Sequence, residues 1–480
     1  MTPIDVDVAI IGSGTAGMSA YSSARAHTDS LLLIEGGDYG TTCARVGCMP
    51  SKLLIAAAEV AHQARHAERF GIIASDLIVD GPAVMARVRR ERDRFVGFVL
   101  ASVEAMPSGD RWTASVSFQD ANTLVTPAGQ VIHARRIVIA TGSRPVVPPM
   151  LQGLTKRLLT SDNIFELPTL PKSVAVFGTG PLGIELGQAL SRLGVAVKMF
   201  GLGGGIGGIR DPEIRDYANK AFNDEFYLDA NAEVESVGET ENGVALRYLH
   251  KDGSRITEEF DYALAATGRA PDLAGLCLVN TGLQLDERGA PRFDRYTLQC
   301  GDSTIFVAGD ANNEIPLLHE AADQGRIAGG NAGRYPNIQP GLRRTPLAIV
   351  FSEPQVAAAG IPLTTLNQHF QGRFATGCAS FENQGRSRVM LRNKGMLKVY
   401  AELGSGVFIG AEMFGPGAEH IGHLLAWAVQ KRMTVNEMLE MPFYHPVIEE
   451  GVRTALRDVK HELHAGAAVV DQGIDYGPGG

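Results

Sequence analysis

Several features that would point to particular partners are missing from this sequence. No basic tract stands out, and 53 acidic residues outnumber 44 Lys and Arg, giving a formal charge of −9. A surface of that average sign repels phosphates, so nucleic acid is not an expected partner. No stretch reaches the roughly 18 uninterrupted apolar residues of a membrane span. Residues 1–5 lead into a predicted strand rather than a signal peptide, so we expect a cytoplasmic protein without membrane association.

Cysteine is also scarce, because five in 480 residues are too few for a disulfide framework. Cys43 and Cys48 nevertheless lie close together in GTTCARVGCMPSK, residues 40–52, whereas Cys277, Cys300 and Cys378 are scattered and expected to be inert. Helical positions five apart lie about 8–9 Å apart at Cα, but a disulfide tolerates about 4.4–6.8 Å. A bridge here would therefore require a distorted helix start.

Three interpretations of the Cys43–Cys48 pair remain open from this segment alone. The pair is a redox couple, a zinc half-site, or two unrelated buried thiols. No second Cys or His pair at ligand spacing lies nearby, so we expect no metal site.

The N-terminal segment has the pattern of a dinucleotide-binding fold. The apolar run Val6–Ile11 leads into GSGTAG, helix formers follow, and a second apolar run ends in Glu35. The glycines, Gly12, Gly14 and Gly17, permit a tight turn, close approach to a pyrophosphate and close helix packing. The helix start offers unpaired N–H groups to phosphates, and Glu35 is placed to hold the ribose hydroxyls.

A second copy of this pattern begins at Ser173. GTGPLG places Gly178, Gly180 and Gly183 at the same spacing, and each copy later ends an apolar strand in Thr-Gly, at 141–142 and 267–268. Two such folds imply two nucleotides, and the cysteine pair inserted in the first implies electron transfer between them.

The second copy differs after its second strand, where Gly201 begins a glycine-rich loop. It has no carboxylate for a ribose 2′-OH and no immediate arginine for a 2′-phosphate; Arg210 is the nearest cation. The choice between NAD and NADP stays open, with NAD favoured. A loop this rich in glycine is able to move and to close only on the cofactor.

The composition changes again after residue 343 and predicts a separate α+β domain. Strands are expected over 347–351, 373–381, 388–391, 396–401 and 407–413, followed by helix 421–429 and the segment HPVIEE before a last helix. The predicted domains are 1–149 and 273–343 for the first nucleotide, 150–272 for the second, and 344–465 for the α+β unit, with a flexible tail at 466–480.

These motifs together resemble a known family. GSGTAG with Glu35, GTTCARVGCMPSK, ATGSRP, GTGPLGIELG, ATGRAPD, AGDAN and HPVIEE occur in the order typical of FAD-dependent pyridine nucleotide-disulfide oxidoreductases, most closely the dihydrolipoyl dehydrogenases. Glutathione and mercuric reductases are relatives. The resemblance covers nearly the whole chain and implies an α/β fold: two Rossmann-like domains, for FAD and NAD(P), plus a C-terminal α+β dimerisation domain.

The resemblance implies two sets of cofactor-binding residues. The FAD set is Gly12, Gly14, Gly17, Glu35, Thr42, Lys52, Ala114, Thr141, Gly142, Ser143, Asp310, Leu318 and His319. The nicotinamide dinucleotide set is Gly178, Gly180, Gly183 and Gly268.

It also implies catalytic roles. Cys48 is the expected charge-transfer thiolate beside the flavin, and Cys43 the thiol that exchanges with substrate. Lys52 is expected to pair with Glu185 near the reactive edge of the flavin. His445, oriented by Glu450, is the expected acid-base residue, supplied by the partner subunit of a homodimer.

The expected reaction passes two electrons between dihydrolipoamide and NAD through a Cys43–Cys48 disulfide. The alternatives are reduction of another disulfide, glutathione-like or protein, and a flavoprotein that senses redox state without turnover. Arg45 stands where the family usually has asparagine, and we expect its charge to favour the neighbouring thiolate. Phe443-Tyr444 replaces the usual His-Ala of dihydrolipoyl dehydrogenases. Mercuric reductases carry extra cysteines near the C-terminus, and this sequence has none there.

Overall fold

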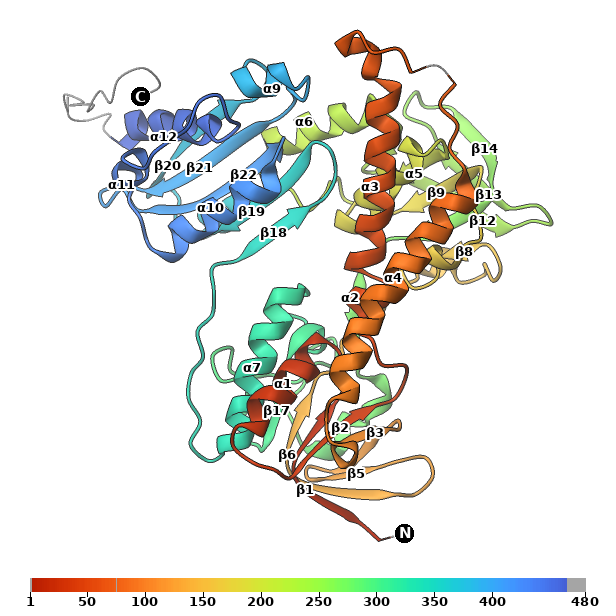
Figure 1. Ribbon diagram of the computed structural model, residues 1–480, viewed down its shortest axis with the longest axis vertical. Helices are drawn as coiled ribbons and strands as arrows, with labels where there is room; N and C mark the ends of the chain where they lie inside the picture. Colours follow the sequence, from red (N-terminus) through yellow and green to blue (C-terminus); the bar gives the residue numbers. More distant parts are fainter. Residues whose placement is uncertain (1, 75, 464–480) are drawn as a thin grey trace.

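A computed structural model describes residues 2–74 and 76–463, so the tail predicted at 466–480 lies outside the described residues. Figure 1 shows three sheet-based parts: one around β1 at the bottom, one around β9 at the upper right and one around β22 at the upper left. The long helices α3 (Cys48–Arg65) and α4 (Gly81–Glu104) extend from the first part to the second. No helix in the described part of the chain is long and apolar enough to cross a membrane.

The first sheet has the doubly wound arrangement that the N-terminal motifs predict. Its strands β3, β2, β1, β6 and β17 are all parallel, and β4 and β5 add an antiparallel edge. The bounds are β1 Ile4–Ile11, β2 Leu31–Glu35, β3 Arg111–Thr113, β4 Ser117–Asp120, β5 Thr123–Val125, β6 Val131–Ile139 and β17 Ile305–Val307. β17 pairs with the end of β6, which returns residues after the second nucleotide fold to the first sheet.

Two helices pack closely on this sheet because one of them presents a row of glycines. α1 is Thr15–Arg25 and α7 is Leu318–Arg334. A Cβ added at Gly325 would lie 2.1 Å from the Ala16 carbonyl oxygen, and one at Gly329 would lie 2.1 Å from that of Ala20. The two backbones therefore approach more closely than any side chain at these positions would allow.

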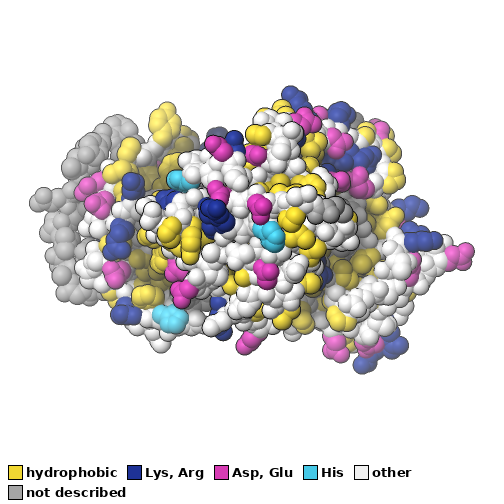
Figure 2. Space-filling view, turned by 90° about the horizontal axis from the view of Figure 1, so that it is seen from below, with side chains coloured by type: hydrophobic (Ala, Val, Ile, Leu, Met, Phe, Trp, Pro, Cys, Tyr) yellow, Lys and Arg dark blue, Asp and Glu magenta, His cyan; other side chains and the backbone are white. Residues whose placement is uncertain are grey.

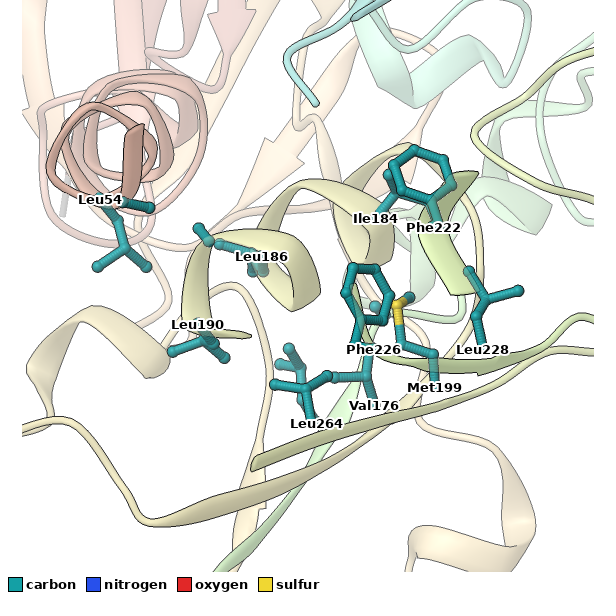
Figure 3. Packing of buried hydrophobic residues seen from close by; sticks show 14 of the residues in the cluster. Leu54, Val176, Ile184, Leu186, Leu190, Met199, Phe222, Phe226, Leu228 and Leu264 are labelled. Atoms are coloured by element: carbon teal, nitrogen blue, oxygen red, sulfur yellow. The ribbon is translucent and has the colours of Figure 1, made fainter. Parts of the chain in front are cut away.

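The second sheet repeats the parallel design with the order β11-β10-β9-β15-β8. Its strands are β8 Leu158–Leu159, β9 Ser173–Phe177, β10 Ala196–Phe200, β11 Tyr227–Asp229 and β15 Tyr262–Ala265, with helices α5 Pro181–Arg192 and α6 Pro212–Asn223. An antiparallel sheet of β12 Glu233–Glu239, β13 Val244–Leu249 and β14 Arg255–Phe260 accompanies it. Figure 3 shows Leu54 of α3 beside Leu186 and Leu190 of α5, so the helix that begins at Cys48 is anchored in the core of the second domain.

The C-terminal sheet is antiparallel, in the order β18-β19-β22-β21-β20, and confirms the α+β character predicted here. Its strands are β18 Leu347–Val350, β19 Gln355–Gly360, β20 Phe374–Ser380, β21 Met396–Glu402 and β22 Phe408–Gly415. The helices are α8 Leu363–His369, α9 Gly385–Val389, α10 Ala418–Gln430, α11 Val435–Leu439 and α12 Glu450–Leu463.

One strand predicted in this domain is absent, and one observed strand was not predicted. Residues 388–391 are not a strand, because the Gln384 side chain caps α9 by accepting from the Ser387 amide, and Leu391 adopts a positive φ of 54°. β19 was missed, since its sequence, QVAAAG, is poor in the β-branched and aromatic residues that mark strands.

The close contact between α1 and α7 predicts an unequal response to two glycine-to-alanine substitutions. Gly329→Ala should lower the free energy of unfolding by about 1–3 kcal/mol, because the added methyl overpacks a close helix contact. Gly97→Ala is the control. Gly97 lies within α4, and an added Cβ there has no atom within 4 Å. The substitution should raise the free energy of unfolding by up to about 1 kcal/mol, because alanine favours the helix over glycine. Urea unfolding followed by circular dichroism measures both, and equal effects would contradict the packing argument.

Candidate active site

The two clustered cysteines lie on either side of a break between helices. Cys43 is in the short helix α2 (Thr42–Arg45), and Cys48 is the first residue of α3. Gly47 joins them with φ −115° and ψ −110°, and an added Cβ there would lie 3.0 Å from the Thr42 carbonyl oxygen. This break is the distortion that close approach of the two sulfur atoms requires.

Both sulfurs are free thiols in this structure, and their ionisation is strongly asymmetric. A hydrogen bond from the Cys43 thiol lowers the pKa of Cys48 to about 7; burial opposes this shift, while the positive charge of Lys52 and the amide of Cys48 itself reinforce it. The hydrogen bond to Cys48, followed by burial, raises the pKa of Cys43 well above its ordinary value. Cys48 therefore carries the thiolate, at a helix N-terminus that favours negative charge.

Lys52 lies one turn further along α3 and forms an ion pair with the second domain. Its Nζ is 2.7 Å from Glu185 Oε2 of α5, and the Glu185 side chain is only 6% exposed. The other oxygen of Glu185 accepts from the Phe351 amide at 2.9 Å, and Lys52 Nζ lies 4.5 Å from the centre of the Phe351 ring. Three separate stretches of sequence therefore meet at one carboxylate.

Phe351 was not anticipated as a site residue. It follows β18 in the C-terminal domain, and nothing in its local sequence indicates contact with Lys52 or Glu185. Only the packing of the third domain against the second brings it there.

Arg45 does not act as the sequence suggested. Its guanidinium donates to Asp38 Oδ2 at 2.8 Å and to the Tyr39 carbonyl oxygen at 3.0 Å. The cation that lowers the pKa of Cys48 is Lys52. Asp38, two residues before the GTTCARVGCMPSK segment, draws Arg45 into the preceding loop.

The residues expected to hold FAD form a cradle with open polar groups. Gly12 has φ +101°, and any Cβ there would lie 2.3 Å from the Ala140 carbonyl oxygen, so the turn requires glycine. Gly14 begins α1 with no side-chain cap and nothing within 4 Å of an added Cβ. The hydroxyl of Thr141 is buried without a hydrogen-bond partner. An uncapped helix start with open space and an orphaned hydroxyl fits a phosphate-bearing ligand.

Glu35 is held in place at the end of β2. One carboxylate oxygen accepts from the Ser13 amide at 2.8 Å and from its hydroxyl at 2.7 Å, and the other accepts from the Gly37 amide at 2.9 Å. Ser13, the second residue of GSGTAG, thus fixes the acid that follows the second strand.

The remaining expected FAD residues surround this cradle. The Ala114 amide donates to the Glu35 carbonyl oxygen at 2.8 Å, and Thr42 begins α2 beside the cysteines. Leu318 and His319 form the exposed start of α7, which has no side-chain cap. Asp310 accepts from the Ser143 hydroxyl at 2.6 Å.

Arg269 links the two nucleotide folds, a role the sequence did not reveal. Its Nε donates to Ser143 Oγ at 2.9 Å and its Nη1 to Ser161 Oγ at 3.0 Å. Beside it, β7 (Ser143–Pro145) and β16 (Arg269–Pro271) form a two-stranded antiparallel sheet. The segments after the two Thr-Gly turns are therefore joined directly.

The second glycine turn repeats the geometry of the first. Gly178 has φ +106°, and a Cβ there would lie 2.3 Å from the Ala266 carbonyl oxygen. A Cβ added at Gly183 would lie 2.0 Å from the Gly178 carbonyl oxygen. An added Cβ would meet no atom within 4 Å at Gly180, which is the uncapped start of α5, or at Gly268. The arrangement suits a second dinucleotide.

His445 lies in the segment between α11 and α12, and Glu450 is the first residue of α12. His445 Nδ1 is 3.0 Å from Glu450 Oε1, and Glu450 Oε2 accepts from the Val447 amide at 3.2 Å. Partial burial opposes ionisation of Glu450, but the hydrogen bonds from His445 and Val447 keep its pKa below the ordinary value. The imidazole is 65% exposed, which leaves Nε2 free to exchange protons.

Within one chain, helices α11 and α12 lie apart from α2. Figure 1 shows α11 and α12 in the C-terminal domain and α2 near the junction of the other two domains. The residues just before α12 face the second domain, because Ile448 and Glu449 line one cavity with Lys52 and Glu185.

Comparison with known proteins agrees with this geometry. Residues 6–325 match the model of the pyridine nucleotide-disulphide oxidoreductase family. The chain belongs to this family. Residues 347–456 match the family's dimerisation domain, in accord with a homodimer, and FAD and NAD(P)H are the cofactors of these oxidoreductases.

Its relatives carry different names at nearly equal similarity. A dihydrolipoyl dehydrogenase from Geobacillus stearothermophilus is 29% identical over 459 residues, covering 93% of this chain and 94% of that protein. A mercuric reductase from Shigella flexneri is also 29% identical, covering 95% and 81%.

Solved structures share the whole architecture. LpdA from Mycobacterium tuberculosis has a TM-score of 0.80 at 26% identity, covering 94% of this chain and 99% of that one. The HOCl-induced flavoprotein disulfide reductase RclA from Escherichia coli has a TM-score of 0.78 at 22% identity, covering 94% and 99%, a likeness of fold alone.

The asymmetric thiol pair predicts how alkylation of Cys48 depends on pH. Cys43→Ala removes the hydrogen bond to the Cys48 thiolate, so the pH midpoint of iodoacetamide labelling should rise from about 7 toward an ordinary thiol, about 8.5. Cys43→Ser keeps a donor and should give an intermediate midpoint. Labelling is quantified on the Cys48 peptide by mass spectrometry, which separates it from Cys277. A midpoint unchanged in Cys43→Ala would contradict the assignment.

Proposed function

We propose that this flavoprotein disulfide oxidoreductase passes two electrons between dihydrolipoamide and NAD through Cys43 and Cys48. The observation that carries the proposal is the cysteine pair at the broken start of α3, with its low-pKa sulfur one turn from the Lys52–Glu185 ion pair. In this proposal residues 1–149 and 273–343 bind FAD, residues 150–272 bind the nicotinamide nucleotide, and residues 344–465 form the dimer.

The proposed exchange follows from the unequal thiols. His445 Nε2 takes a proton from one substrate thiol, and the resulting thiolate attacks Cys43 Sγ in the Cys43–Cys48 disulfide. The Sγ–Sγ bond breaks, and Cys48 leaves as the thiolate, since the thiol of lower pKa is the better leaving group. The second substrate sulfur then attacks the first, the mixed disulfide breaks, and the proton of the second thiol passes to the leaving Cys43 sulfur, whose pKa is raised. The products are a cyclic substrate disulfide and a reduced cysteine pair.

Bound FAD supplies the redox chemistry that accepts two electrons from thiols and passes them to a nicotinamide. Gly12, Gly14, Thr141 and Glu35 are the residues proposed to hold its phosphates and ribose, with Ser143 orienting Asp310. Lys52 keeps its charge near Cys48 because Glu185 fixes its ammonium group.

Dimerisation is part of the proposal, because His445 would act on the cysteines of the partner chain. The outer face of α10 carries exposed apolar side chains, with Trp427 63% and Leu424 45% exposed. Such a face in a domain that matches the dimerisation model suits contact with a second copy. We propose a cytoplasmic location, where thiols are kept reduced and a dithiol couple can cycle.

A second candidate is an NADPH-dependent reductase of another disulfide. The observation that favours it is Gly201, where an added Cβ would lie 2.6 Å from Thr179 Oγ1 and 2.8 Å from the Ala230 carbonyl oxygen. No carboxylate for a ribose 2′-OH can stand at that position with this backbone.

Steady-state kinetics distinguish these candidates. Dihydrolipoamide oxidation is measured with NAD⁺ and NADP⁺, and NADH and NADPH oxidation with lipoamide, glutathione disulfide and cystine. We expect kcat/KM for the lipoyl substrate to exceed the others by roughly tenfold or more. Faster turnover of glutathione disulfide or cystine would move the assignment to the second candidate.

Mixed dimers test the sharing of the site between chains. Cys48→Ser and His445→Gln homodimers should each lose dithiol turnover while retaining FAD. A purified dimer with one chain of each kind has one site with both residues intact, and should regain roughly half of the wild-type rate. Inactive mixed dimers, with both parents folded and flavin-loaded, would show that His445 does not act in trans.

A further inference from the structure

The glycine-rich loop after β10 lies where a nucleotide ribose is bound in this type of fold. Residues 201–208 follow the carboxyl end of β10, at the sheet edge that carries the second glycine turn. The loop is tied to that turn, because the Gly207 amide donates to the Thr179 carbonyl oxygen at 2.8 Å and the Thr179 hydroxyl donates to the Gly205 carbonyl oxygen.

Hydrogen bonds connect the loop to the end of β11 and to the residues that follow it. The Gly201 amide donates to the Asp229 carbonyl oxygen at 2.7 Å, and that of Gly204 to the Ala230 carbonyl oxygen at 2.9 Å. Asn231 Oδ1 accepts from the Gly203 amide at 3.2 Å. Because Gly201 has no room for a side chain, the loop presents mainly backbone atoms to a ligand.

The C-terminal end of the loop is held by another domain. Glu412 of β22 is 2% exposed, and its carboxylate accepts from the backbone amide of Arg210 and, at 3.2 Å, from that of Asp211. Ile206 and Ile209 are buried in one core with Val350 and Phe414 of the C-terminal domain.

Charges around Glu412 complete this contact. Asp211, 1% exposed, caps α6 by accepting from the Glu213 and Ile214 amides. Lys398 of β21 lies 3.1 Å from Asp211 and 2.6 Å from Glu213, and the Tyr400 hydroxyl lies 3.4 Å from Asp211. One ammonium group of the C-terminal domain thus balances two acids at the start of α6.

We propose that Glu412 is a positioning residue for the nicotinamide nucleotide: it holds the 201–211 segment so that backbone groups of the loop contact the adenosine ribose. The C-terminal domain thereby sets nucleotide affinity without touching the nucleotide. This inference rests on the proposed function, because it assumes that the second fold binds a nicotinamide nucleotide.

The test compares Glu412→Gln with wild-type holoenzyme, using whichever of NADH and NADPH the wild type prefers. Replacing a carboxylate by an amide weakens two charge-assisted hydrogen bonds, so the nucleotide KM and the Kd from calorimetric titration should rise about tenfold. The kcat, the KM for the lipoyl substrate and the flavin content should each change by less than about twofold. A general loss of structure would move all of these together.

Two further variants keep the test decisive. Glu402→Gln, an exposed carboxylate of β21 that accepts from Ser405, is the matched control and should leave the nucleotide KM unchanged. Glu412→Asp keeps the carboxylate but shortens the side chain by one methylene group. It replaces Glu412→Gln if that variant does not fold, and the nucleotide KM and Kd should again rise about tenfold. An unchanged nucleotide KM in the folded variant overturns the inference alone. A wild-type chain that binds neither nucleotide overturns the proposed function as well.

Discussion

The architecture depends on the ion pair between Lys52 and Glu185. Glu185 is 6% exposed, so its charge is tolerable only because the Lys52 ammonium and the Phe351 amide both contact the carboxylate. Removing one partner of a buried pair commonly costs about 3–5 kcal/mol, since it leaves a charge without compensation. Because the three groups belong to α3, α5 and the end of β18, the requirement to pair this charge fixes the relation of three domains.

The two nucleotide folds are also joined by paired polar groups, here through backbone and side-chain hydrogen bonds. After each Thr-Gly turn the chain extends into a short strand, and these strands pair with each other. Arg269 from the second fold donates to Ser143, which donates to Asp310 in the first. Strand pairing and side-chain hydrogen bonds therefore tie the two cradles together where they meet.

Much of this site could be predicted from the sequence because its chemistry is encoded locally. Glycine turns need glycine for reasons of backbone space, and the acid after the second strand is located by the strand itself. Residues that act across domains were not predictable in this way. Phe351, Arg269 and Glu412 have ordinary local contexts, and their partners lie 166, 126 and 202 positions away. The prediction that Arg45 favours the neighbouring thiolate was not met because of a local contact: its guanidinium donates to Asp38, seven residues earlier in the sequence.

The placement of His445 on the C-terminal domain, and of the cysteines on α2 and α3, has a consequence for how the protein behaves when diluted. If each site combines cysteines from one copy with an imidazole from another, an isolated copy keeps its thiolate, its Lys52–Glu185 pair and its nucleotide cradles, yet has no base to deprotonate a dithiol. The turnover rate per chain then decreases as the protein is diluted and the dimers dissociate. The concentration of the protein in the cell thereby determines what fraction of its chains is active, independently of the supply of substrate.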